Sequence, residues 1–501
     1  MTCPAPAPNI PERLVHPNDE VTVSRDLLLR RTSTILCAAL LCACARSPFG
    51  ESPAPLEPRA EAFLDTLQQR TFGYFWNLTD ARTGLTPDRA PTRTFASIAA
   101  VGFALTAYPV GVERGYVTRS QAAERVLTTL RFFWEAPQGP EAAGRAGHHG
   151  FFYHFLHLED GTRYQTVELS TIDTALLLGG VLFCEMYFDG ASADEVAIRA
   201  YADSIYRRVD WTWAQPRPPL VTMGWYPEKG FHHLDWRGYN EAMLLYVLAL
   251  GSPTHPVDTT AWSEWTSTYA WGSFEGREQL GFAPQFGHQY SHVWIDFRGI
   301  QDAYMRGRGI DYFENSRRAT LSQRDYGRRN PDGWVAYSDS IWGWTASDGP
   351  ADATLMVGGR QRQFFTYRAR GVSFTEIVDD GTVVPTAAGG SIPFAPTETV
   401  GALLAMRRTY GDPLFSTYGF LDAFNPTFTS TGPLQHGRMV TGVAWFDTDY
   451  LGIDQGPILI MAENYRTGLV WRYMRRHPAI IRGLERAGFT GGWLAEAAPV
   501  P

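Results

Sequence analysis

Residues 236–256, WRGYNEAMLLYVLALGSPTHP, place one acid at the start of an otherwise apolar run. Apolar residues recur at helical spacing from Trp236 to Leu250, and Gly251-Ser252-Pro253 ends the pattern. The stretch predicts a helix over 237–250 that is fit for a core, with Glu241 in its first turn. A long connection (210–236) leads into this helix and a short one (251–257) leaves it.

The same alternation of connections extends along the chain. Helical patterns are predicted at 59–77, 94–111, 119–135, 167–188, 192–209, 237–250, 258–271, 291–306, 310–327, 396–410, 412–420 and 449–464, with one or two more between 466 and 486. Long and short connections alternate between them, which is typical of αα-hairpins packed as a closed ring. We therefore predict an all-α fold, an (α/α)6 toroid of six helical hairpins, in one domain spanning 59–494.

The connection 328–395 is too long to lack structure in a compact domain. Its segments RQFFTYRA and VSFTEIVDDGTVVPT predict a small β-hairpin or lid.

Every long connection leads into an even-numbered helix, so the starts of these helices should face one rim. Function usually lies on such loops when a rigid scaffold holds them. The polar clusters expected to converge there are Arg93, Glu168 to Asp173, Arg237 to Glu241, His288 to Asp296, Pro385 to Ser391, and Asp447 to Asp454.

Composition narrows the class of ligand. Of 501 residues, 44% are apolar, 14% are aromatic and 19% are charged, with a formal net charge of -8. This balance supplies no basic face for nucleic acid. The 16 Trp fit either a groove for hydroxyl-rich ligands or a large aromatic core, and composition leaves both open.

Residues 25–45, RDLLLRRTSTILCAALLCACA, predict a secretory signal that is too short to span a membrane as a mature helix. The run Leu41–Cys44 resembles a bacterial lipobox with Cys44 lipidated; plain signal cleavage is the alternative. We interpret 1–24 as a non-native or disordered extension and 45–58 as a tether rich in Pro and Ser. The expected location is the periplasm, or the outer membrane as a lipoprotein, of a Gram-negative bacterium, with membrane contact only through Cys44.

Glu241 is the first candidate for chemistry. Burial among Trp236, Tyr239 and Met243 should raise its pKa, while Arg237 should lower it. A carboxyl that stays protonated near neutrality is a general acid. The alternative is an N-terminal Glu that complements the helix dipole.

Other acids also lie in apolar walls, where an isolated Asp is costly unless it is paired or working. Asp173 follows VELSTI, and Asp454 opens the helix of IDQGPILIMAENYRTG. Asp422 in GFLDAFN, or Asp447 or Asp449, could activate water. Glu168 is expected to cap a helix, and Glu463 and Arg466 to pair at i, i+3.

Opposed carboxyl groups around an aromatic-lined hole suit glycoside hydrolysis, which uses one acid and one base or nucleophile. Each aromatic side chain could instead belong to the core. In WGWTASDG, however, Trp342 and Trp344 are not both expected to be core. The candidates for sugar binding are Arg93, Trp225, Trp236, Arg237, Tyr239, Asn240, His288, Tyr290, His292, Trp342, Trp344 and Glu463.

No metal or other cofactor is expected. The histidines of GHHGFFYHFLH are dense, but no HExxH-like spacing accompanies them, and Cys184 is the only cysteine after residue 44. We expect Cys184 to be a buried small hydrophobe. No GxGxxG, Walker or GxSxG motif is present.

Ordered blocks across residues 60–490 resemble the bacterial glucoamylase-like domain, grouped with the endo-β-1,2-glucanases of glycoside hydrolase family 144. These blocks are GYFWNLTDARTGLTPDR, VELSTIDTALLLGG, WRGYNEAMLLYVLALGSPTHP, HQYSHVWIDFRG, WGWTASDG, VVPTAAGGSIPFAP, YGFLDAFN and IDQGPILIMAENYRTGLVW. The resemblance implies an (α/α)6 fold and hydrolysis of β-1,2-glucan (sophoro-oligosaccharides) with inversion. It implies that Glu241 is the acid, that Asp173 is catalytic or positions substrate, and that Asp422 or Asp454 is the base.

Residues 351–381 form a longer segment than this family's pattern leads one to expect, so exo action that releases sophorose stays open beside endo action. Three alternatives also stay open: a hydrolase of another β-glucan, a polysaccharide lyase, and a non-catalytic surface glycan-binding lipoprotein. All predict a sugar in the same cleft. The partner we expect is a glucan oligosaccharide or polysaccharide, and we expect a monomer.

Overall fold

The computed structural model describes residues 56–497 except 431 and 433, and these residues belong to one compact unit. The interpretations of 1–24 and 25–44, and of the tether up to residue 55, fall outside the described residues. Within the described part of the chain, no helix combines the length and the apolar character needed to cross a membrane.

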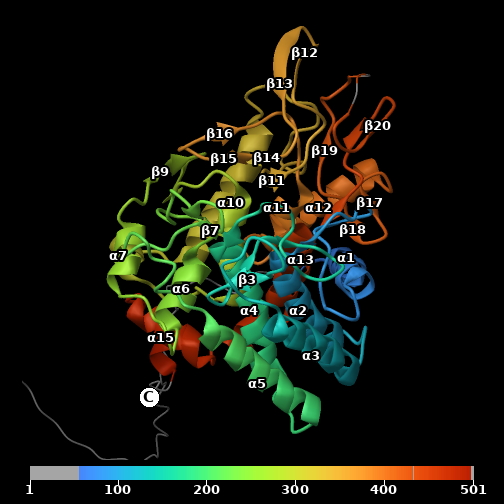
Figure 1. Cartoon of the computed structure of the whole chain (residues 1–501). Coiled ribbons are helices and arrows are strands. Elements are labelled where there is room, and N and C mark those ends of the chain that lie inside the picture. Colours follow the sequence, from blue (N-terminus) through green and yellow to red (C-terminus); the bar gives the residue numbers. More distant parts are fainter. Residues whose placement is uncertain (1–55, 431, 433, 498–501) are drawn as a thin grey trace, which may run out of the picture. The chain divides into compact units, whose positions relative to one another are not determined.

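Helices dominate this unit (Figure 1). They are α1 Pro58–Leu78, α2 Ile98–Glu113, α3 Arg119–Glu135, α4 Thr171–Tyr187, α5 Ala193–Arg208, α6 Met243–Gly251, α7 Thr260–Thr266, α8 Tyr290–Trp294, α9 Ala303–Arg308, α10 Tyr312–Arg329, α11 Pro385–Gly389, α12 Pro396–Tyr410, α13 Gly452–Thr467, α14 Leu469–Met474 and α15 Pro478–Arg486, with 3-10 turns η1 Gln285–His288 and η2 Gly492–Glu496.

Short strands occupy the connections. They are β1 Arg89–Ala90, β2 Ala96–Ser97, β3 Gly147–His148, β4 Phe151–Tyr153, β5 Phe155–Leu156, β6 Leu169–Ser170, β7 Gly224–Tyr226, β8 Gly230–Phe231, β9 Trp271–Phe274, β10 Arg277–Leu280, β11 Ala346–Ser347, β12 Ala353–Val357, β13 Arg360–Phe364, β14 Arg368–Ala369, β15 Gly371–Val372, β16 Ile377–Val378, β17 Phe415–Ser416, β18 Gly419–Phe420, β19 Phe424–Asn425, β20 Arg438–Val440, β21 Ala444–Phe446 and β22 Tyr450–Leu451. The largest sheet has the order β3-β4-β6-β7-β8, and all strand pairs are antiparallel.

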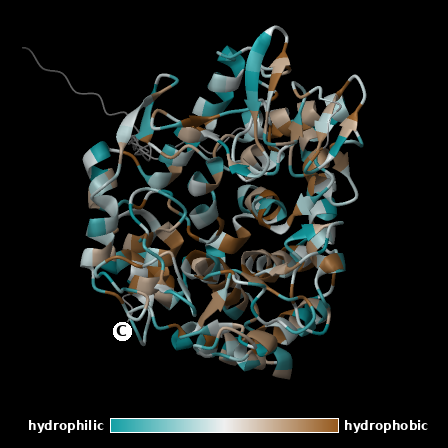
Figure 2. Cartoon of the chain, turned by 45° about the horizontal axis from the view of Figure 1, so that its top comes forward, coloured by the Kyte–Doolittle hydropathy of each residue, from teal (hydrophilic) through white to brown (hydrophobic). Residues whose placement is uncertain are grey.

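The apolar helices form the core. Almost every residue of α2, α4 and α6 is buried, and α2 packs on α4, α4 on α6, and α13 on both α1 and α2. Helices α2 and α4 approach closely at Gly102 and Gly180, where an added Cβ would lie 2.3 Å from the Leu176 carbonyl oxygen and 2.1 Å from the Gly102 carbonyl oxygen, respectively. Figure 2 shows much brown in these helices, whereas the β12–β13 hairpin at the top combines one hydrophilic strand with a more hydrophobic one.

Side-chain caps explain where several helices begin. Ser97, Ser170 and Ser192 each accept a backbone N–H at the start of α2, α4 and α5. The helix predicted from residue 237 begins later, at Met243, because Gly238 has φ +75° and Asn240 Oδ1 accepts the Ala242 N–H in a preceding turn. Glu241 therefore lies in that turn rather than within the helix.

Two predicted helices were wrong. Residues 412–420 form the β17–β18 hairpin, in which Gly419 has φ +96°. The helix predicted at 291–306 is divided into α8 and α9 by a turn in which Gly299 has φ +75°. A small β-hairpin within 328–395 is confirmed, but the longest one, β12–β13 at the top of Figure 1, begins before the two segments named for it. Within those segments the strands are the end of β13, β14, and the short β15–β16 pair.

Candidate active site

Glu241 presents an unsatisfied buried carboxyl oxygen. Its Oε2 has no hydrogen-bond partner among the described residues, while Ser291 Oγ donates to its backbone carbonyl at 2.9 Å. Burial raises the pKa of Glu241 to about 7, and the charge of Asp173 acts in the same direction. A carboxyl with this pKa holds its proton at mildly acidic to neutral pH.

Asp173, in the first turn of α4, lies beside Glu241 and is held by two neighbours. Ser170 Oγ donates to Asp173 Oδ2 at 2.5 Å, and His154 Nε2 lies 3.5 Å from the same oxygen. His154 Nδ1 lies 2.7 Å from Glu168 Oε1. Burial lowers the pKa of His154, but Asp173, Glu168 and Asp88 outweigh burial and raise it to about 9. His154 is thus an imidazolium that binds Asp173 and Glu168, and Ser170 rather than Glu168 caps α4.

A second acid group comes from the C-terminal third of the chain. Asp454 in the first turn of α13 and Asp422 after β18 hydrogen-bond to each other and are both buried. Burial raises the pKa of both groups, that of Asp454 to about 7. The contact between the two carboxyl groups raises the pKa of Asp422 and lowers that of Asp454. The pair therefore keeps a proton to a higher pH than an isolated Asp does.

One arginine offsets part of this negative charge. Arg89 Nη1 lies 2.6 Å from Asp348 Oδ2, and Arg89 Nε lies 3.1 Å from Asp88 Oδ2. The Asp348 backbone N–H donates to Asp422 Oδ2 at 2.7 Å. Burial and neighbouring Asp charges also raise the pKa of Asp447.

Tyr290, on α8, connects the two acid groups. Its pKa is raised first by burial and then by Asp454, Tyr367, Glu241 and Asp173. All four side chains thus lie near one ring, although they come from segments far apart in the sequence. The expected convergence of helix starts is met for α4, α6, α8 and α13.

A cleft of about 540 Å³ opens beside the Asp348 end of this group. It is lined by Arg89, Thr92, Thr94, Phe95, Asp348, Tyr367, Gln435, His436, Gly437, Thr448 and Asp449. Arg93, a predicted binding residue, is exposed between two of these residues. Trp225 is partly buried, with its ring 5.1 Å from that of His148.

The residues just before Glu241 support the fold. Trp236 is buried and its Nε1 donates to Thr171 Oγ1 at 3.0 Å, and Tyr239 stacks on Tyr312. Arg237 is exposed and pairs with Glu264 at 2.9 Å. The prediction that Arg237 lowers the pKa of Glu241 was wrong, because its guanidinium turns toward solvent and Glu264.

Three more predicted binding residues lie in the interior. His288 Nε2 lies 3.1 Å from the Phe282 carbonyl oxygen and His292 Nε2 lies 3.0 Å from Ser316 Oγ. Burial lowers their pKa values to about 4 and about 3, so both are neutral at pH 7. Glu463 bonds to Arg114 at 2.6 Å rather than to Arg466.

Trp342 and Trp344 are both fully buried, so the prediction that one ring would leave the core was wrong. Asp379 gives the reason: it accepts from Tyr337 and Tyr326 hydroxyls at 2.7 and 3.0 Å and from Trp344 Nε1 at 3.2 Å. These bonds hold a Gly/Ser/Asp loop inside an aromatic cluster.

Sequence reasoning missed Arg89, His154, Asp348 and Tyr367 as parts of the site. Signals existed for the first and third, because TPDR and WGWTASDG lie in the blocks that carry the family resemblance. Tyr367 lies in the segment 351–381 that departs from the pattern, so only the structure brings it to the acids.

Asp348, Asp422 and Asp447 each offer a carboxylate oxygen within 4.8 Å of the others, a geometry that hard cations can use. However, Asp348 already pairs with Arg89, and burial together with the Asp454 charge raises the pKa of Asp422, which favours its neutral form. We therefore interpret these groups as acceptors for hydroxyls, and the absence of a metal stays a prediction.

Comparison with known proteins places this geometry in a family. Residues 233–478 match the Glycoamylase family model, described as "Putative glucoamylase". A solved structure described in the same words, from Bacteroides uniformis ATCC 8492, is 30% identical with a TM-score of 0.74 and covers 88% of this chain and 100% of that chain. An endo-β-1,2-glucanase from Chitinophaga pinensis is 25% identical with a TM-score of 0.73, again covering 88% and 100%.

A curated exo-β-1,2-glucooligosaccharide sophorohydrolase (non-reducing end) from Parabacteroides distasonis is 28% identical over 465 residues, 85% of this chain. The chain spans 58% of the length of that relative.

The fold and the acid-lined cleft thus define a helix-rich protein of the glucoamylase-like class. The chain belongs to this glucoamylase-like family, of the type grouped in glycoside hydrolase family 144, which confirms the resemblance found in the sequence.

Proposed function

We propose that this protein hydrolyses β-1,2-glucan and its sophoro-oligosaccharides. The relatives named as an endo-β-1,2-glucanase and an exo-acting sophorohydrolase support the substrate class. The observation that carries the proposal is that two buried carboxyl groups with raised pKa values, Glu241 and Asp454, both act on the hydroxyl of Tyr290.

In the proposed mechanism Glu241 donates its proton to the glycosidic oxygen as the bond to the anomeric carbon breaks. Water attacks the opposite face of the sugar, and Asp454 accepts the proton that this water loses. Asp422 keeps the shared proton and directs a hydrogen bond to Asp454, so that Asp454 is the oxygen base of the pair. The product anomer is inverted.

Asp173 and the Arg89–Asp348 pair serve binding in this scheme. Asp173, fixed by Ser170 and His154, faces Glu241 and accepts a sugar hydroxyl. Asp348 and Asp449 line the cleft and can accept further hydroxyls. These charge-assisted bonds orient the scissile linkage between acid and base.

The finer architecture belongs to the same proposal. We assign α2, α4, α6, α8, α11 and α13 to the inner ring of an (α/α)6 toroid, and α1, α3, α5, α7, α10 and α12 to the outer ring. The packing of α13 on α1 and α2 supports closure of this ring.

We further propose export guided by residues 25–44, with Cys44 as a lipid anchor in the periplasmic or outer-membrane setting, and a monomeric catalytic unit spanning 59–494.

The test is product analysis with linear β-1,2-glucan, with wild type beside Glu241→Gln. We expect sophorose or longer oligosaccharides from the wild type and essentially none from the variant, with an inverted anomer seen by NMR at early times. If both proteins bind the glucan and neither cleaves it, the non-catalytic glycan-binding interpretation replaces this one.

A further inference from the structure

Tyr367 is an aromatic side chain displayed at the cleft. It is 50% exposed although it lines the cleft with Asp348, and its pKa is raised by burial of its hydroxyl and by Asp422, Asp454, Asp88 and Asp348. The ring thus stands above the acids without being packed into the core. An exposed aromatic face beside hydroxyl acceptors is the environment that a sugar ring fits.

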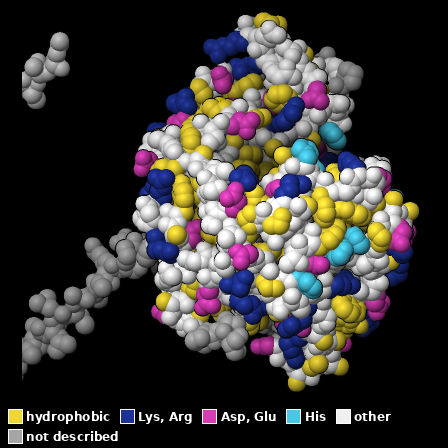
Figure 3. All heavy atoms as spheres, turned by 60° about the vertical axis from the view of Figure 1, so that its left-hand side comes forward, with side chains coloured by type: hydrophobic (Ala, Val, Ile, Leu, Met, Phe, Trp, Pro, Cys, Tyr) yellow, Lys and Arg dark blue, Asp and Glu magenta, His cyan; other side chains and the backbone are white. Residues whose placement is uncertain are grey.

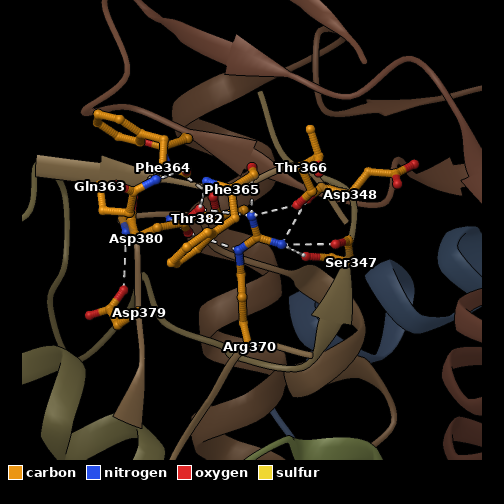
Figure 4. Close-up of polar contacts among 12 residues, drawn as sticks. Ser347, Asp348, Gln363, Phe364, Phe365, Thr366, Arg370, Asp379, Asp380 and Thr382 are labelled. Atoms are coloured by element: carbon orange, nitrogen blue, oxygen red, sulfur yellow. Dashed lines mark hydrogen bonds and ion pairs between the residues drawn. The ribbon is translucent and has the colours of Figure 1, made fainter. Parts of the chain in front are cut away.

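The backbone is held in place on both sides of Tyr367. Strand β14, which follows it, pairs with β11: Ala346 with Ala369 and Ser347 with Arg368. The carbonyl oxygens of Phe365 and Thr366, which precede it, accept from Arg370 Nη2 at 3.1 and 3.0 Å (Figure 4).

The Arg370 guanidinium is fully buried, and each of its nitrogens donates. Nε and Nη2 grip Asp380 at 2.8 and 2.7 Å, and Nη1 donates to the carbonyl oxygens of Ser347 at 2.8 Å and Asp348 at 3.2 Å. One buried cation therefore connects the backbone of Asp348 on the cleft floor with the backbone beside Tyr367 on the cleft wall. Its planar fork is matched to this set of acceptors in a way that an ammonium is not.

Two neighbouring residues, Gly349 and Asp352, further fix the position of this loop. An added Cβ at Gly349 would lie 2.2 Å from Arg370 Nη2, so the Asp348 turn can approach the guanidinium only with glycine there. Asp352 accepts from the Thr366 backbone N–H at 3.1 Å and from its hydroxyl at 2.9 Å. The β12–β13 hairpin, between Asp352 and Phe365, is thereby fixed at its base.

We propose that Tyr367 is a specificity-determining residue that stacks on a sugar ring and bounds one end of the cleft, and that Arg370 is the positioning residue that holds it there. The inference rests on the proposed glucan hydrolysis and deepens it. Because Tyr367 is held in place, it limits how many sugar units bind on its side of the scissile bond. This limit favours release of short products from a chain end.

The experiment compares Tyr367→Ala, Tyr367→Phe and Arg370→Lys, with Arg362→Lys as the matched control. Arg362 lies on the same hairpin, over the Trp334 ring and bonded to the Asp332 carbonyl oxygen, away from the cleft. Kinetics use a ladder of β-1,2-gluco-oligosaccharides, and products are resolved by chain length.

We expect Tyr367→Ala to raise KM about tenfold, the effect of removing on the order of 50 Å² of apolar contact, with kcat changed about twofold or less. Longer products should appear beside the short ones. Tyr367→Phe and Arg362→Lys should behave like the wild type. Arg370→Lys should raise KM in the same direction.

A double-mutant cycle separates positioning from mere stability. If Arg370 acts through Tyr367, Arg370→Lys added to Tyr367→Ala produces little further rise in KM. Additive rises, or a lower melting temperature for Arg370→Lys with KM and products unchanged, would overturn the positioning role. Unchanged products and KM for Tyr367→Ala would overturn the stacking role.

If Arg370→Lys does not fold, Asp352→Asn replaces it in the experiment. Asp352 is exposed, and its substitution weakens the contact with Thr366 that holds the same loop. A wild type that cleaves no β-1,2-glucan would instead refute the proposed function, an outcome distinct from these.

Discussion

At the residue scale, Glu241 shows how an apolar neighbourhood produces chemistry. Its Oε2 is buried without a partner among the described residues, so the charged form is disfavoured and the proton is retained. In the proposed mechanism this proton passes to the glycosidic oxygen. We predict that Glu241→Gln lowers kcat by about 10²–10⁴-fold on glucan. Glu264→Gln, at the exposed partner of Arg237, is the control and should retain activity. Full activity of Glu241→Gln would remove this residue from the mechanism.

The same residue predicts how stability depends on pH. The folded pKa of Glu241 is about 7 against 4.5 in an unperturbed chain. Below pH 4.5 the side chain is protonated in both the folded and the unfolded protein, so its burial does not lower the unfolding free energy. Above pH 4.5 the unfolding free energy falls as the pH rises through about 7. We therefore compare the unfolding free energy of Glu241→Gln with that of the wild type at two pH values. The variant should gain on the wild type by up to about 3 kcal/mol between pH 4 and pH 8. Equal differences at both pH values, measured by calorimetry, would contradict the raised pKa.

Asp454 sets the other side of the pH profile of activity. The base must be ionised and the acid protonated, and both pKa values lie near 7. We predict a narrow bell for kcat/KM centred near neutrality, with Asp454→Asn losing about 10²-fold or more and Asp422→Asn losing less. An Asp422→Asn variant that is more impaired than Asp454→Asn would reverse the two roles.

At the element scale, the contact between α2 and α4 depends on glycine. Because Gly102 and Gly180 bring two backbones together, we predict that Gly102→Ala destabilises the fold by about 1–3 kcal/mol in chemical denaturation. Gly401→Ala on α12 is the matched control, since an added Cβ there meets nothing within 4 Å and an exposed helix interior favours Ala. Similar effects of the two substitutions would contradict the close approach.

Elements with strong periodicity could be predicted from the sequence, and those set by tertiary context could not. Helices such as α3 and α12 appear where expected because pattern and punctuation agree. The β17–β18 hairpin was misread because its Phe415–Phe420 pair brackets a turn that depends on the backbone of Gly419. Trp344 was misread because the acceptor of its Nε1, Asp379, lies more than thirty residues further along.

At the scale of the whole molecule, the location of the site could be predicted but its detailed contacts could not. Alternating connections placed the helix starts on one rim, which brought Asp173, Glu241 and Asp454 together in advance. The Arg89–Asp348 pair spans 259 positions, and the position of Tyr367 depends on the buried guanidinium of Arg370. Neither contact follows from the local sequence pattern. Buried carboxyl groups at Glu241 and Asp454 were thus predictable, and the surroundings that set their pKa values were not.

The charge balance of the cleft gives a prediction for metal removal. On the face shown in Figure 3, acidic and basic side chains are interspersed rather than gathered in one field. Within the cleft, Arg89 and shared protons offset the Asp cluster. We predict that dialysis against EDTA leaves kcat unchanged and that added Ca²⁺ or Mg²⁺ does not raise it. Loss of activity that Ca²⁺ restores would instead make Asp348, Asp422 and Asp447 cation ligands.

The packing of α15 on α6 has a consequence for the making of the protein. Gly483 approaches the Val247 carbonyl oxygen, and Arg482 donates to the Gly251 carbonyl oxygen across 231 positions of sequence. The helix next to Glu241 therefore packs not only on α4 and α8 but also on a segment that lies far along the chain from it. Such distant pairings raise the contact order of the fold, and a high contact order slows folding because the intervening chain must be closed before the contact forms.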